Sequence, residues 1–185
     1  MAFNAYLLFD PKGDGKSDIM GESTSQLFKD KGAIEIADYG FNVAMPVTTS
    51  RSDGGGATVG RANFEVFTST KNIDKSTPKL VEYCCLGKNI AKITLHLYRA
   101  GAEDDTGAVK YAFVAFKNCV VTKVGISGSG EELPKESLEF NYGICEYHYQ
   151  LTLHDTGAKK DAPIKFGWST IENRVWDKLE DMHAK

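Results

Sequence analysis

The sequence contains no long apolar run and no excess of positive charge. None of its segments approaches the roughly 18 consecutive apolar residues that a membrane-spanning helix needs. Its 22 basic and 25 acidic side chains give a net charge of −3, which does not favour nucleic acid as a partner. Residues 1–6 lack a basic segment followed by an apolar run and a cleavage site. We therefore expect no membrane insertion, and synthesis in the cytoplasm without a Sec-type signal peptide.

Cysteine is also scarce, with four residues in a chain of 185. Cys84, Cys85, Cys119 and Cys145 form no CxxC pair, and no histidine lies at a spacing typical of a zinc site. We expect them to be reduced, partly buried and structurally equivalent to small apolar residues. The sequence predicts neither a metal nor a cofactor.

Period-two alternation of apolar and polar residues dominates the chain and predicts strands. Glycine-containing loops separate many of the strands, and a chain of this length fits one domain. Many strands without intervening helices favour an antiparallel sandwich or barrel. The expected strands are 3–9, 34–43, 62–68, 91–98, 109–115, 119–126, 138–142, 145–153 and 164–171.

One segment breaks this alternation and predicts a short helix at about 77–86. Thr77 suits the N-cap, Pro78 suits the first helical position, and Gly87 suits a left-handed residue after the last turn. An apolar stripe within it consists of Leu80, Val81, Cys84 and Cys85. A helix this short is unstable alone, so we expect it to pack on the sheet.

Two further segments contain no catalytic or ligand-binding motif, but they are relevant to assembly. Residues 48–60 form a long polar, glycine-rich loop between two strands, which we expect to order only against a neighbouring molecule. After the strand at 164–171 we expect a short amphipathic tail.

The segments that resemble catalytic or ligand-binding motifs each lack a residue that the motif requires. The loop from Asp10 to Asp18 resembles a calcium-binding loop, but Lys12 and Gly21 occupy ligand positions, so we expect a solvated turn. Gly15-Lys16-Ser17 ends like a P-loop, yet Asp10 stands where the first glycine must be. Three of the four histidines fall on the polar faces of strands. We therefore expect a structural protein and not an enzyme.

Several strings, in order, resemble one family. The most specific are residues 73–78 (IDKSTP) and 165–168 (KFGW), supported by 21–24 (GEST), 127–130 (SGSG) and 147–149 (YHY). From about residue 3 to 173 the chain resembles the Hcp family (haemolysin-coregulated proteins), the tube subunit of bacterial type VI secretion systems. The resemblance divides the chain into an Hcp-like β-barrel domain at 1–173 and a short tail at 174–185.

The resemblance implies a mainly β fold, namely a compact antiparallel β-barrel of two sheets with one short helix. It implies homohexameric rings that stack into a hollow tube inside a contractile sheath, tipped by a VgrG-type spike, with small effector proteins in the lumen. The subunit would be cytoplasmic before firing and secreted afterwards. The loop at 10–20 looks longer than the usual first loop, and the tail is too short for a fused toxin domain.

The expected tube architecture also gives roles to two segments, one facing the lumen and one at an interface between subunits. Tyr39, Gly40, Phe41 and Asn42 would line the lumen. The ring or stacking contact would be made by a loop containing Met45, Pro46, Val47, Thr48, Arg51, Asp53, Gly54, Gly55, Gly56 and Val59.

Three alternatives stay open at this point. A phage-tail-tube-like protein would share the same architecture. A secreted enzyme or toxin would need a catalytic constellation that only the fold assembles. A secreted carbohydrate-binding β-sandwich would use Tyr6, Tyr142, Tyr147 and Tyr149 to stack on sugars, although strand aromatics more often belong to the core.

Overall fold

The structure, a computed structural model, describes residues 4–28, 31–47, 60–100, 108–130, 133–152 and 160–181. It is mostly β-strand with one α-helix, as the alternation predicts. The strands are β1 (Asn4–Asp10), β2 (Ile34–Ile36), β3 (Asp38–Gly40), β4 (Val43–Ala44), β5 (Asn63–Phe64), β6 (Phe67–Asn72), β7 (Asn89–Ala100), β8 (Ala108–Ser127), β9 (Lys135–Asn141), β10 (Ile144–Tyr149), β11 (Ile164–Ser169) and β12 (Arg174–Val175). A 3-10 turn, η1 (Gln26–Phe28), and the helix α1 (Thr77–Leu86) complete the elements.

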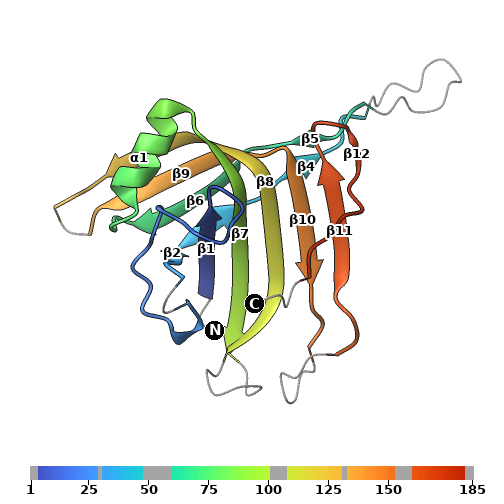
Figure 1. Cartoon of the computed structure of the whole chain (residues 1–185), viewed down its shortest axis with the longest axis horizontal. Coiled ribbons are helices and arrows are strands. Elements are labelled where there is room, and N and C mark those ends of the chain that lie inside the picture. The colour runs from blue at the N-terminus through green and yellow to red at the C-terminus, as the bar shows by residue number, and fades with distance from the viewer. Residues whose placement is uncertain are drawn as a thin grey trace, which may run out of the picture.

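The strand β8 organises the sheet (Figure 1). The sequence predicts two strands here, but the chain runs unbroken over 20 residues. Asn118 takes a positive φ of 54°, and the register shifts between Val121 and Lys123. The first part of β8 pairs with β7 and β10, and the last part pairs with β9. The sheet therefore branches at β8.

This branching explains why the sheet is not the closed barrel that we expected. One path runs β12-β11-β10-β8-β7-β1-β2, and β3, β6 and β9 lie off it, while β4 and β5 form a separate two-stranded sheet. At Ala37 the chain changes partner from β1 to β6, and a hydrogen bond of 2.8 Å from Ala37 N–H to Thr70 O marks the seam. Beyond β8, the strands β10 to β12 extend sideways as a flange (Figure 1).

Aromatic side chains fill the centre of the core, which the sheet wraps around. The rings of Phe67, Phe116 and Phe140 lie within 5.2 Å of one another, centroid to centroid. Aliphatic residues from β1, β2 and β7 pack around them. All three rings are fully buried, so their apolar area contributes its full share to the free energy of folding.

The helix α1 packs against β8 at one end of the sheet. Leu80 and Tyr83 are buried, whereas Val81 and Cys85 of the expected stripe are exposed. The cap also differs from the prediction by one residue, because Ser76 is the N-cap and Thr77 the first helical residue. The Thr77 hydroxyl donates to the buried Glu136, and the Asp74 carboxylate accepts the Ser76 N–H at 2.9 Å. Gly87 has the expected left-handed conformation (φ 57°).

The first residues of the expected tail pair with the edge of the sheet. β12 pairs with β11, and residues 176–181 then cross the outer face of the sheet without helical structure. Among the described residues, α1 and η1 are the helices, and neither is long and apolar enough to cross a bilayer.

Candidate functional site

The second half of β10 is buried on its polar side and exposed on its apolar side, which the sequence pattern does not predict. Tyr147, Tyr149 and Leu151 occupy the apolar positions and should face the core, yet they are 37–42% exposed. Glu146 and His148 occupy the polar positions and are fully buried. The apolar side of β10 thus faces the core at Cys145, which is buried, but the same side is left uncovered further along the strand at Tyr147 and Tyr149.

Neighbouring strands extend this exposed apolar surface. The β10–β11 register places Tyr147 beside Phe166 and Tyr149 beside Ile164. Tyr39 and Tyr111 adjoin it: burial raises both their pKa values, and the nearby Tyr147 phenol raises both further. We call this surface the aromatic face; it consists of Tyr39, Tyr111, Tyr147, Tyr149, Ile164 and Phe166. Contiguous exposed apolar surface of this kind marks a binding or assembly site.

A second exposed apolar element, β4 and β5 with residues 45–47 and 60–62, lies at the upper end of the flange beside β11 (Figure 1). We call it the arm. Val43, Met45 and Val47 on it are each about half exposed. Its base is fixed, because Phe64 stacks on Trp168 at 6.1 Å and the Arg61 guanidinium donates to Thr170 O at 2.8 Å. A fixed base and an apolar tip suit the arm for contact with another chain.

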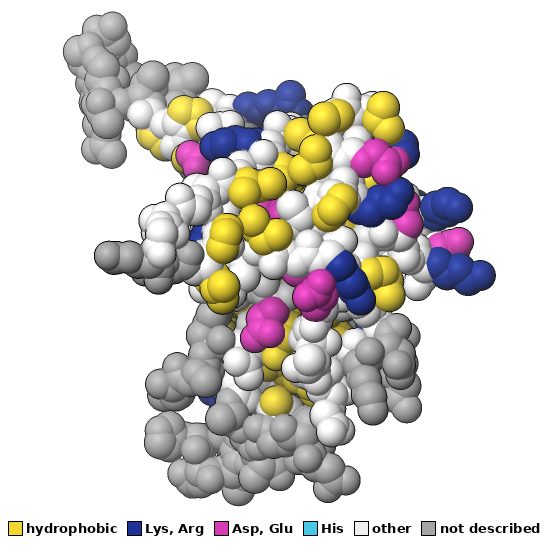
Figure 2. Space-filling model, turned by 90° about the vertical axis from the view of Figure 1, so that its left-hand side faces the viewer, with side chains coloured by type: hydrophobic (Ala, Val, Ile, Leu, Met, Phe, Trp, Pro, Cys, Tyr) yellow, Lys and Arg dark blue, Asp and Glu magenta, His cyan; other side chains and the backbone are white. Residues whose placement is uncertain are grey.

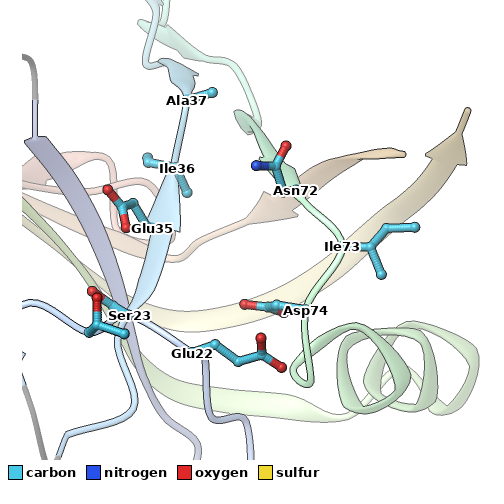
Figure 3. A pocket seen from close by; sticks show the side chains of 9 residues that line it. Glu22, Ser23, Glu35, Ile36, Ala37, Asn72, Ile73 and Asp74 are labelled. Atoms are coloured by element: carbon cyan, nitrogen blue, oxygen red, sulfur yellow. The ribbon is translucent and has the colours of Figure 1, made fainter. Parts of the chain in front are cut away.

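A hollow of about 530 Å³ lies where the 22–24 segment, the β2–β3 seam and the approach to α1 meet (Figure 3). Its acidic side chains are Glu22, Glu35 and Asp74. Two of these carboxylates are already engaged, since Glu22 accepts the Lys75 N–H at 2.8 Å and Asp74 binds Lys71 Nζ at 2.7 Å. The hollow therefore presents no free pair of carboxylates for acid–base chemistry.

The other motifs that the sequence offered have structural roles in the folded chain. The Asp10 carboxylate accepts hydrogen bonds from the N–H groups of Gly13 and Gly15 at 2.7 and 3.1 Å. The calcium-like loop is therefore a turn that the Asp10 side chain stabilises. The four cysteines are free, and burial raises the pKa of Cys145 to about 11. In the described part of the chain, no group of three or more acidic, histidine or cysteine side chains is placed to hold a metal.

Comparison with known proteins identifies the family. The family model described as "Type VI secretion system effector, Hcp" matches residues 10–149. The chain belongs to the Hcp family. Protein hcp1 of Pseudomonas aeruginosa is 35% identical over 114 residues, which are 61% of this chain and 68% of that protein.

Solved structures show the same fold. One described as a type six secretion system protein superposes with a TM-score of 0.80 at 24% identity, covering 95% of this chain and all of that one. Hcp1 of Salmonella typhimurium gives a TM-score of 0.71 at 23% identity over the same shares of the two chains. The family is one of structural, secreted proteins of type VI secretion systems.

The structure separates the residues to which the Hcp resemblance gives interface roles. Met45, Pro46 and Val47 lie on the arm, whereas Thr48, Arg51, Asp53, Gly54, Gly55, Gly56 and Val59 fall outside the described residues. Within the expected lumen strand, Tyr39 stacks on Phe67 and Phe41 contacts Phe116, both towards the core. Asn42 points outward and binds Glu65 at 3.0 Å.

Sequence reasoning missed the buried pair of Lys71 and Glu136, and the buried Glu146 that pairs with the partly exposed Lys117. For the first set a signal was present, because Lys71 follows the inward positions of β6 and Glu136 those of β9. For Glu146 no local signal exists, since residues 176–181, far along the chain, help to bury it.

Proposed function

We propose that this Hcp-family chain is the structural subunit of a hexameric ring, that rings stack into the inner tube of a type VI secretion system, and that the lumen carries small effector proteins. The observation that carries the proposal is the exposure of Tyr147 and Tyr149 on the apolar side of β10. A strand that hides its polar face and exposes its aromatic one needs another molecule to cover the aromatic side.

The arrangement of exposed surfaces favours head-to-tail contact between copies. The arm and flange occupy one side of the subunit, and α1 with the β8–β9 connection occupies another (Figure 1). Figure 2 shows the side carrying α1, where hydrophobic side chains gather between groups of charged ones. Exposed apolar residues of these elements include Val81, Ile126 and Leu133. Two different apolar surfaces on one subunit support a heterologous interface, which gives a ring when its rotation closes.

Two finer assignments belong to this proposal. The segment 44–60 reaches across the ring or to the next ring, so deleting residues 48–57 should prevent stable rings or tubes. Residues 39–42 line the lumen, so bulky residues at Gly40 should reduce effector retention. Intact tubes after the deletion, or unchanged retention, would remove the respective assignment.

The proposal also names partners and location. A VgrG-type spike at the tube tip and a contractile sheath around it would act with the tube. The subunit would be cytoplasmic before contraction and extracellular afterwards.

Negative-stain electron microscopy of the purified full chain tests the proposal directly. We expect six-fold rings with an open centre. A monodisperse monomer at micromolar concentration, by light scattering and by microscopy, would overturn the ring.

A further inference from the structure

A second hollow, of about 730 Å³, lies on the outer face of the sheet, opposite the core. Its floor is formed by β1, β7 and β8, and its walls by the loop at 15–20, η1 and residues 180–181. This volume falls in the range of ligand sites in proteins. We call it the lysine-rimmed hollow, because Lys16, Lys31, Lys92 and Lys110 line it.

The floor of this hollow is aromatic and apolar. The His96 ring lies between Phe28 and Phe113, at centroid distances of 5.3 and 5.1 Å. Leu8 and Leu27 complete the apolar lining. A planar apolar group could therefore be covered here on several sides.

The lining carries four lysines and three carboxylates, those of Asp10, Glu180 and Asp181. Asp10 is used by the turn at Gly13 and Gly15. The Glu180 carboxylate lies 3.4 Å from Lys92 Nζ and 3.2 Å from Lys117 Nζ. Within the described residues, no carboxylate forms an ion pair with Lys16 or Lys31.

His96 lies on the floor of the hollow, where the charges of Lys31, Lys92 and Lys110 all act on it. Its Nε2 lies 3.0 Å from Thr94 Oγ1, and its buried Nδ1 has no hydrogen-bond partner in the part of the chain that the structure describes. Burial, and then the charges of Lys110, Lys31 and Lys92, lower the pKa of His96 to about 3. The ring is therefore neutral at physiological pH, and the lysines supply the charge of the hollow.

We propose that the lysine-rimmed hollow binds a small anion with a planar apolar body, of the aryl carboxylate or aryl phosphate class. The apolar body would lie on Phe28 and Phe113, and the anionic group would meet Lys31 and Lys110. Charge-assisted hydrogen bonds to the lysines are strong because both partners are ionised, and the buried floor screens them less than bulk water does.

Isothermal titration calorimetry of the purified full chain with four naphthalene probes tests the proposal. The probes share an apolar ring and differ in charge, so they separate the contribution of charge to the affinity from that of apolar contact. We expect 1-naphthoate, 1-naphthyl phosphate or both to bind, and neutral 1-naphthalenemethanol and cationic 1-naphthylmethylamine to bind at least about tenfold more weakly. If only the phosphate binds, the site selects phosphate; if only the carboxylate binds, it selects carboxylate. Equal binding of the neutral probe, or no binding by either anion, would overturn the proposal.

Substitutions locate the binding. Lys31→Gln and Lys110→Gln should each weaken anion binding about 3- to 10-fold, and Asp181→Asn should strengthen it because a negative charge leaves the rim. Lys75→Gln, an exposed lysine beside α1, is the matched control and should bind as the unmodified chain does. Binding that is unaffected in both lysine variants would place the anion elsewhere. Ring formation is read separately by microscopy, so this result does not depend on the tube.

Discussion

Lys71 and Glu136 are buried charges that connect β6 and β9 beneath the start of α1. They are paired across the two strands, with Lys71 Nζ 3.2 Å from Glu136 and 2.7 Å from Asp74. The Thr77 hydroxyl donates to Glu136, which ties the first residue of the helix to the same cluster. Removing Glu136 leaves Lys71 buried with Asp74 as its remaining counter-charge, and removing Lys71 leaves Glu136 buried without its ammonium partner. Breaking a buried pair in this way costs more than replacing both partners with apolar residues.

We expect Glu136→Gln to lower the free energy of unfolding by about 3–5 kcal/mol, because Lys71 then lies buried without its full counter-charge. Urea denaturation measures the change. Glu139→Gln is the matched control: Glu139 pairs with Lys123 at 2.8 Å near the surface, and its loss should cost less than about 1 kcal/mol. Replacing both partners, as in Lys71→Met with Glu136→Leu, should restore most of the loss. Equal effects of Glu136→Gln and Glu139→Gln would contradict this account.

Glu146 is buried on the opposite face of the sheet. Burial alone raises its pKa, but the nearby His148, the Lys117 ammonium at 2.7 Å and the Glu180 N–H at 2.9 Å outweigh burial and hold the pKa at about 2. The ordinary value is 4.5, so the charged form is favoured by folding. The stabilisation is complete above pH 4.5 and is lost as the pH falls towards 2.

We expect Glu146→Gln to flatten the pH dependence of stability between pH 4.5 and 2, and to lower stability at pH 7 by on the order of 2–3 kcal/mol. Thermal unfolding across this pH range measures it. Glu172→Gln, in an exposed pair with Arg174, should keep the slope of the unmodified chain. An unchanged slope in Glu146→Gln would show that other groups carry the acid dependence.

At the scale of elements, residues 176–181 lie closely on β11. A Cβ atom added at Gly167 would come within 2.6 Å of both the Trp176 carbonyl oxygen and Leu179 Cδ2. The Trp176 N–H also donates to Gly167 O at 2.9 Å, and Lys165 Nζ donates to Glu180 O at 3.2 Å. Gly167 thus allows the close approach by which this segment covers Glu146.

We expect Gly167→Ala to displace residues 176–181, since the backbone carbonyl of Trp176 cannot avoid the added methyl group by changing rotamer. The cost should be about 1–3 kcal/mol. Trypsin cleavage after Lys178 should become faster, and hydrogen exchange at Glu180 should increase. Gly130→Ala, whose added Cβ meets nothing within 4 Å, is the control. Equal cleavage rates in the two variants would argue against the packing described.

At the scale of the whole molecule, the flange carries the exposed aromatic residues that another molecule can contact. β10 to β12 extend the sheet past β8, where the core no longer covers their inner side. Tyr147 and Phe166, paired across β10 and β11, are therefore exposed in one subunit. In the proposed ring a neighbouring subunit would bury them.

We expect Phe166→Glu to abolish rings while leaving the subunit folded, because Phe166 is about half exposed in a single subunit and a charge there would be buried without a partner in the ring. Light scattering and circular dichroism measure assembly and folding separately. Lys12→Glu, in the exposed first loop, should leave rings intact. Intact rings in Phe166→Glu would remove the aromatic face from the interface.

The sequence by itself determined most of the strands, the short helix with Gly87 at its end, and the family. These depend on local signals, namely residue alternation, Pro78 and glycine conformation, and strings such as IDKSTP. The tertiary structure decided which face of each strand is buried. Alternation distinguishes two faces but cannot tell which one the rest of the chain covers.

β10 shows the physical reason. Residues 176–181 help to cover Glu146 on its polar face, and the branching of the sheet at β8 leaves Tyr147 and Tyr149 uncovered on the other. Both causes are long-range contacts that no local pattern contains. The same holds for Lys71 with Glu136, and for the hollow at which Lys31, Lys92 and Lys110 meet around His96. The sequence set the elements, and the contacts between distant segments set the surfaces.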